Sequence, residues 1–269
     1  MNSLIIRLFI LINLVLLFTQ CKKKEDTGLI ASEQEYILGS YLDTIILNDP
    51  EEYNILDRSL FKKAYGYADS VLIKILKSGD IKRKSSIKYT LRIIDSDEIN
   101  FFVFPGGYMY INTGFIKYLD NGAQFAGAMA HQVAHIDRRH LTGILENKLD
   151  IDVILGITIW GDSKYDLDHL VENIITGSEG FVYPENIEYE ADEYAVKYTS
   201  ATSYDPLGIA GFLSKADQSN QNGNKPGFLS AHPFSDLRVE KINQVWEEIE
   251  SPEGGLFTNE YRNFVHNLP

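Results

Sequence analysis

The sequence has little cysteine, a deficit of basic residues and no apolar run long enough to cross a membrane. One of its 269 residues is cysteine, which excludes an intramolecular disulfide. Lys and Arg number 25 against 38 Asp and Glu, a formal net charge of −13. Because proteins bind a phosphate backbone through clustered Lys and Arg, we expect no nucleic-acid partner. The apolar run at residues 8–18 falls well short of the roughly 20 residues that a spanning helix needs.

What the sequence does contain is typical of a folded protein. Hydrophobic residues make up 44% and aromatic residues 12% of the chain, so enough apolar surface is available to build a core. We find no internal repeat and no change in composition that would separate two domains. The chain after its first 31 residues is therefore interpreted as one main domain.

The first 20 residues resemble a bacterial lipoprotein signal peptide. Arg7 precedes the apolar run, and Cys21 stands directly after the segment. The resemblance implies cleavage before Cys21, lipidation of that cysteine and a polar tether over residues 21–31. It places the protein in the bacterial cell envelope, anchored by lipid on the periplasmic side of the inner or outer membrane. The alternative is an uncleaved N-terminal anchor.

Hydrophobic periodicity predicts mostly helix with a few strands in the middle of the chain. A capping box from Ser32 to Glu35 begins the first helix. Helices are expected at residues 32–47, 53–77, 121–149, 151–160, 185–199, 205–215 and 235–250. Strands are expected at residues 87–95, 101–104 and 108–112. The last two strands are separated by Pro105-Gly106-Gly107, which predicts a turn.

Two histidines in the long central helix have the spacing of metal ligands. His131 and His135 are four residues apart, so their imidazoles lie on one helix face and can bind one ion. His140 lies about 140° further round and is expected to be exposed or behind the ligands. Taken alone, the pair favours two ordinary helical histidines over a metal site.

A second helix supplies the carboxylate that such a site needs. Glu188 and Asp192 share one face of the helix at residues 185–199. Glu188 can ligate the metal while Asp192 accepts the free ring N–H of a ligand histidine and fixes its orientation. Two His and one Glu, with the fourth position left to water, form the ligand set of a catalytic zinc site.

Five stretches resemble, in this order, zinc metallopeptidase family 48, the gluzincins that include the heat-shock membrane protease HtpX and the CAAX prenyl proteases. They are PGGYMYINTG at 105–114, HQVAHIDRRH at 131–140, EYEAD at 188–192, YDP at 204–206 and HPFSDLR at 232–238. The resemblance implies a mainly helical α+β fold with a small β-sheet beside the active-site helix. It covers residues 32–250 as a metallopeptidase-like domain and leaves residues 251–269 as a C-terminal tail. It also implies one bound Zn²⁺ and a polypeptide partner, extended or misfolded.

The same resemblance assigns further residues to the site. It implies that Gly106, Gly107 and Tyr108 border the cleft and pair with the substrate backbone. It places His232 and Arg238 near the zinc, where either could stabilise the oxyanion and His232 could cap the open coordination position.

One residue departs from the family pattern at the position that matters most. The family's zinc helix has a Glu between the two His as general base, and this chain has Gln132. An amide is not a usable base at neutral pH, and loss of a general base typically costs about 10²–10⁴ in rate. Glu185, one turn before Glu188, is a possible substitute base. Two hypotheses follow: a zinc endopeptidase of the envelope with impaired activity, or an inactive zinc-binding pseudopeptidase that serves as a chaperone-like or scaffold module.

Overall fold

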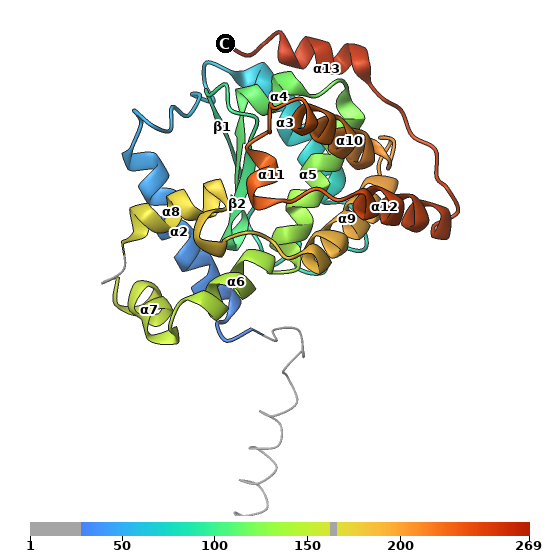
Figure 1. The fold of residues 1–269 in the computed structure, drawn as a ribbon. Helices are drawn as coiled ribbons and strands as arrows, with labels where there is room; N and C mark the ends of the chain where they lie inside the picture. The colour runs from blue at the N-terminus through green and yellow to red at the C-terminus, as the bar shows by residue number, and fades with distance from the viewer. Residues whose placement is uncertain (1–27, 162–165) are drawn as a thin grey trace, which may run out of the picture.

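A computed structural model describes residues 28–161 and 166–269, shown as a ribbon in Figure 1. The predicted signal peptide and Cys21 lie outside these residues. Among the helices of the described part, none combines the length and apolar character needed to cross a bilayer. The family-based fold prediction is confirmed, because most of the described chain is helical and surrounds one small sheet.

The sheet has three strands in the order β1-β3-β2. β1 (Thr90–Ile94) runs parallel to the central strand β3 (Tyr108–Asn112), and β2 (Phe101–Phe104) runs antiparallel to it. β2 pairs in the register Phe101↔Ile111 through Phe104↔Tyr108, so its other side is an edge of the sheet. A 3-10 turn, Pro105–Gly107, joins β2 to β3.

Side-chain alternation along these strands separates two hydrophobic cores. Phe101 and Val103 point into a core with the central helix, whereas Phe102 and Phe104 point into a second core on the opposite face. Figure 1 shows this layering, with the strands between two groups of helices. Each residue of β2 thus faces one of two different environments.

The first core is built around α5 (Gly122–Asp137), and the other helices on that side pack around it. They are α3 (Lys62–Ile75), α4 (Thr113–Tyr118), α9 (Glu185–Ser200), α10 (Gly208–Gln221), α11 (Phe228–Ala231), α12 (Asp236–Glu248) and α13 (Thr258–Val265). The second core is covered by α2 (Ser32–Asn48), α6 (His140–Lys148), α7 (Ile151–Leu155) and α8 (Leu167–Thr176). A π-helical turn, Gly156–Trp160, continues α7.

Several expected boundaries are wrong by a turn or more. The helix expected at 121–149 is two helices, because Arg139 adopts a left-handed conformation (φ 62°) between α5 and α6. The helix expected at 53–77 begins only at Lys62. The capping box of α2 is one residue earlier than predicted, since the side chain of Gln34 accepts from the backbone N–H of Ala31.

The segment that the sequence suggested as a C-terminal tail is part of the fold. It contains α13, and Tyr261 and Phe264 of this helix are buried in the first core. The hydroxyl of Tyr261 donates to the carbonyl of Ile116 at 2.6 Å. The folded domain therefore extends beyond residue 250.

Candidate metal centre

Helix α5 carries two of the candidate ligands in the interior of the molecule. Its first turn is capped by Asn121, whose side chain accepts from the backbone N–H of Gln124 at 3.0 Å. His131 and His135 are 0% and 1% exposed, and their Nε2 atoms are 3.0 Å apart. Their i, i+4 spacing directs both rings to the same point.

Two other segments complete a group of four side chains around that point. Glu188, in the first turn of α9, places Oε1 3.3 Å from Nε2 of His135. His232, which follows α11, places Nδ1 2.9 Å from Oε1 of Glu188 and 3.3 Å from Nε2 of His131. We call His131, His135, Glu188 and His232 the ligand cage. All four are buried, and their candidate ligand atoms lie within 4.8 Å of one another.

The donor set and its spacing fit a zinc ion. Imidazole nitrogen and carboxylate oxygen are zinc ligands, and bonds of about 2.0–2.1 Å in a tetrahedron imply ligand–ligand separations of about 3.3–3.4 Å. The interatomic separations of 2.9–3.3 Å in the cage approach this value. The group could therefore hold a metal ion with little rearrangement.

Asp192 and Arg238 surround the cage with a buried network of charges. Oδ1 of Asp192 lies 2.9 Å from Nδ1 of His131, at an ion-pair distance although without the alignment of a hydrogen bond. Nε and Nη2 of Arg238 donate to the two carboxylate oxygens of Asp192 at 2.7 and 2.8 Å. Nη1 of Arg238 lies 2.6 Å from Oε2 of Glu188. Arg238 therefore orients Asp192 through two hydrogen bonds and offsets one of the two negative charges of the buried carboxylates.

This network and burial set the protonation states of the cage. Burial alone would raise the pKa of Glu188, but Arg238 and the nearby histidines hold it well below its ordinary value. Burial, together with the proximity of His131, lowers the pKa of His135 well below its ordinary value. Burial also lowers the pKa of His232. At neutral pH these three groups are an ionised carboxylate and two neutral imidazoles, the forms that bind a metal.

His140 and Glu190 form a chain of polar contacts that orients His135. Nδ1 of His140 lies 3.0 Å from Nδ1 of His135, and Nε2 of His140 lies 3.4 Å from Oε2 of Glu190. Glu190 also accepts from Nε of Arg138 at 2.7 Å. Glu190 completes a His135–His140–Glu190 chain. The backbone break at Arg139 turns His140 back toward α5, which helical spacing could not reveal.

Gln132 contacts both the edge strand and the cage. Its Nε2 donates to the carbonyl of Phe101 in β2 at 2.9 Å and lies 3.1 Å from Nε2 of His232. Its Oε1 is buried and has no hydrogen-bond partner within the described residues. With Nε2 of His232 as the acceptor, Nδ1 of His232 carries the proton and donates to Glu188. Gln132 thus joins β2, His232 and the ligands in one hydrogen-bonded arrangement.

The sequence matches peptidase family M48 over residues 64–245, which is more than half of the chain and contains the whole cage. The chain belongs to this family. The predicted family is confirmed, and the matched residues include a buried His and Glu group that could hold a metal ion.

The curated M48 relatives of this chain have low sequence identity to it. The chain is 26% identical over 156 residues to the beta-barrel assembly-enhancing proteases of Yersinia pestis and Escherichia coli, an alignment that covers 55% of this chain and 32% of each relative. It is also 26% identical over 188 residues to the mitochondrial metalloendopeptidase OMA1 of Schizosaccharomyces pombe, covering 68% of this chain and 53% of that protein. This M48 chain therefore spans a third to a half of the curated relatives it matches.

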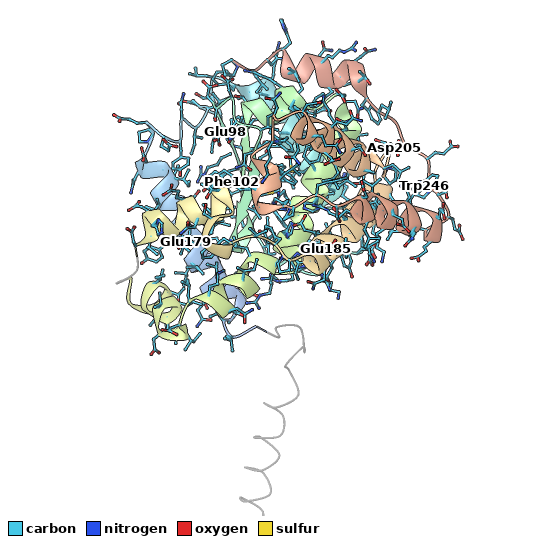
Figure 2. The ribbon with its side chains drawn as sticks, in the orientation of Figure 1. Glu98, Phe102, Glu179, Glu185, Asp205 and Trp246 are labelled. Atoms are coloured by element: carbon cyan, nitrogen blue, oxygen red, sulfur yellow. The ribbon has the colours of Figure 1, made fainter. Side chains whose placement is uncertain are left out.

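The possible substitute base and the residues that the resemblance assigns to substrate binding lie away from the cage of this M48 protein. Glu185, the possible substitute base, is exposed and accepts from the hydroxyls of Ser235, at 3.0 Å, and Tyr189. Figure 2 labels it at the start of α9. These hydrogen bonds lower its pKa, Tyr189 contributing most. Among the described residues it has no contact with the ligands, so the geometry gives no support for its role as a base.

The Gly106-Gly107 turn and Tyr108 face α2 rather than the cage. A Cβ on Gly106 would lie 2.6 Å from Cα of Tyr36, and the ring of Tyr108 stacks on that of Tyr36 with centroids 5.9 Å apart. Tyr108 belongs to the central strand, which is paired on both sides. The strand edge beside the cage of the M48 domain is that of β2, whose Phe101 carbonyl contacts Gln132.

Aromatic side chains cover the cage. The ring of Tyr183 lies 4.0 Å from that of His135 and 4.7 Å from that of His232, measured between centroids. The ring of Phe228 stacks on the other face of His232 at 4.2 Å. His232 is thus held between two rings, and the cage of this M48 protein is closed to solvent.

Proposed function

We propose that this protein binds one Zn²⁺ through His131, His135 and Glu188 and acts on polypeptides in the bacterial cell envelope, with weak or no peptide-bond hydrolysis. The observation that carries the proposal is an M48 ligand cage with Gln132 at the position of the general base. The retained ligands favour zinc binding. The missing carboxylate argues against efficient turnover.

In this proposal the residues around the metal site have separate roles. When bound, Zn²⁺ supplies Lewis acidity and lowers the pKa of water to about 7. Asp192 and His140 fix the rings of His131 and His135, and Arg238 keeps Glu188 ionised. Gln132 can hydrogen-bond but cannot take a proton, which typically costs about 10²–10⁴ in rate.

A second function is favoured by the position of His232. Its Nδ1 stands 2.9–3.3 Å from ligand atoms of Glu188 and His131, where a catalytic site leaves room for water. A cage closed by four protein side chains is typical of structural zinc sites. This geometry supports the alternative, a pseudopeptidase that holds envelope polypeptides as a chaperone-like or scaffold module.

The envelope assignment rests on the N-terminal sequence and on relatives. Arg7, the apolar run at 8–18 and Cys21 support secretion and lipid anchoring. The bacterial relatives are named for enhancing β-barrel assembly, which supports envelope proteins as substrates or clients.

The test compares the purified full chain in detergent with two variants, Gln132→Glu and His135→Ala. Zinc content is measured by elemental mass spectrometry and hydrolysis with unfolded casein. We expect about one zinc per chain in the unmodified protein and in Gln132→Glu, and loss of zinc in His135→Ala. We expect casein cleavage by Gln132→Glu to exceed that of the unmodified chain by about 10²-fold or more.

Three outcomes test the impaired peptidase against the pseudopeptidase. Rapid casein cleavage by the unmodified chain, abolished by a chelator, would contradict the impairment. Cleavage by neither form, together with suppression of casein aggregation by the unmodified chain, would support the pseudopeptidase. Absence of stoichiometric zinc would overturn the site assignment itself.

A further inference from the structure

A cavity of about 290 Å³ lies on the face of the sheet opposite the ligand cage. It is bounded by the C-terminal ends of β1 and β3, the start of β2, the last turns of α8 and the segment around Tyr53. Its lining residues are Glu52, Tyr53, Ile94, Ser96, Glu98, Phe102, Asn112, Glu172, Ile175 and Thr176. We call it the acidic cavity. Figure 2 labels Glu98 and Phe102, two of these residues, near β2.

The charged residues that line the acidic cavity are all acidic. Glu52, Glu98 and Glu172 are exposed at its rim, and none of the ten lining residues is basic. Within the described residues Glu52 and Glu98 form no ion pair, and Glu172 has only His169, 3.9 Å away. Burial first, and then the charges of Glu52, Asp49, Glu172 and Glu98, raise the pKa of Tyr53 to about 12.

The floor of the cavity contains a polar group without a partner. Asn112 is 4% exposed, and its Oδ1 has no hydrogen-bond partner among the described residues. Asn112 pairs with Ile94 across β1 and β3, and its side chain shares a sheet face with Phe102 and Tyr110. That face is the one on which the cavity opens. A buried acceptor of this kind costs free energy unless a donor reaches it.

The remaining lining is apolar. Ile94, Phe102 and Ile175 are buried at the floor, and the ring of Tyr53 stands at the side. Such a surface can cover a methylene stem, and aromatic faces attract a cation. Among the described residues, these carboxylates belong to no group of three or more His, Cys, Asp or Glu side chains close enough to hold one metal ion.

We propose that the acidic cavity binds the guanidinium or primary ammonium head of an arginine or lysine side chain, or of a small amine with the same head and stem. Several donors on one head can reach separated carboxylates and the amide of Asn112, which a single ion cannot. The volume suits one side chain. The cavity would thereby bind a cationic group beside β2, the strand whose Phe101 carbonyl contacts Gln132 from the opposite face.

The experiment measures binding to the full chain in a non-ionic detergent by saturation-transfer NMR. The probes are a capped Gly-Arg-Gly peptide, the same peptide with citrulline in place of arginine, and agmatine. The pocket variant is Glu52→Gln with Glu98→Gln. The control is Glu33→Gln with Glu240→Gln, which removes the same charge from exposed positions outside the cavity.

We expect the arginine peptide to bind saturably and the citrulline peptide to bind at least fivefold more weakly. We expect the pocket variant to weaken the arginine peptide by roughly fivefold or more and the control by less than twofold. Agmatine binding as tightly as the peptide supports a small amine as the source, and tighter peptide binding supports a polypeptide.

Equal binding of the citrulline and arginine peptides would overturn the proposal, as would equal effects of the pocket variant and the control. No saturable binding of any cationic probe would also overturn it. None of these readouts depends on zinc or on hydrolysis, so failure here leaves the proposed function standing.

Discussion

Gln132 couples the candidate metal site to the sheet through its amide. Its Nε2 donates to the Phe101 carbonyl and faces Nε2 of His232, which assigns the ring proton of His232 to Nδ1. For Nδ1 to ligate a metal instead, the proton must move to Nε2, and Gln132 must then turn Oε1 toward it. A Glu at this position would accept from Nε2–H without that turn. The side chain at residue 132 therefore influences whether Nδ1 of His232 can ligate a metal, in addition to its effect on catalysis.

His140 is expected to act on the metal site by holding His135. Because its Nδ1 lies 3.0 Å from Nδ1 of His135, His140→Ala removes the acceptor that fixes the ring. Loss of such an orienting partner typically lowers metal affinity about 10–100-fold. The measurement is zinc affinity by competition with a chromophoric chelator, with Glu193→Gln as control. His140→Gln, which restores a carbonyl acceptor, should recover part of the affinity. An unchanged affinity in His140→Ala would contradict the role.

Tyr53 should make the stability of the protein sensitive to alkaline pH. Its pKa is raised from 10.0 to about 12 in the folded state, first by burial and then by neighbouring carboxylates. The neutral phenol is favoured on folding, so this stability is fully present below pH 10 and is lost as the pH rises through about 12. We expect Tyr53→Phe to reduce the loss of unfolding free energy between pH 9 and 11 by roughly 1 kcal/mol, after screening by solvent. Urea titrations at both pH values measure it, and identical losses would contradict it.

The packing of α2 on the Pro105–Gly107 turn depends on one glycine. A Cβ at Gly39 would lie 1.8 Å from the carbonyl oxygen of Pro105, so Gly39→Ala forces α2 away from the turn. We expect a loss of about 1–3 kcal/mol in unfolding free energy, measured with urea. Gly66 in α3 is the matched control, because a Cβ there meets nothing within 4 Å. Gly66→Ala should stabilise by roughly 0.5–1 kcal/mol. Equal effects at the two sites would show that α2 is not tightly packed.

Some elements could be predicted from the sequence because local signals coincide with tertiary ones. Strands 101–104 and 108–112 match β2 and β3, since Pro105-Gly106-Gly107 separates two apolar runs. Three members of the cage followed from the spacing of His131, His135 and Glu188. The break between α5 and α6 could not be predicted, because Arg139 is neither Gly nor Pro and its left-handed conformation depends on tertiary contacts with Ile30 and Glu35. The role of β2 as the edge strand depends on sheet order, which periodicity does not encode.

At the scale of the whole molecule, the three-stranded sheet separates the ligand cage from the acidic cavity. On the α5 face, the four residues of the ligand cage are buried beside Asp192 and Arg238. On the other face, the acidic cavity has three carboxylates at its rim, of which Glu52 and Glu98 form no ion pair within the described part of the chain. β2 contributes to both sites. Its Phe101 carbonyl contacts Gln132 on one face, and its Phe102 ring lines the acidic cavity on the other.

The C-terminal helix α13 packs on both α3 and α5. The ring of Phe264 in α13 stacks on Tyr67 of α3 at 4.5 Å and lies 5.3 Å from Phe125 of α5, between centroids. Phe264 is 2% exposed, so Phe264→Ala should lower the unfolding free energy by about 3–5 kcal/mol. Urea unfolding measures this, with the exposed Asn263→Ala expected within about 0.5 kcal/mol of the unmodified protein. Because α13 lies outside the matched residues 64–245, equal stability of the two variants would mean that the family domain folds without it.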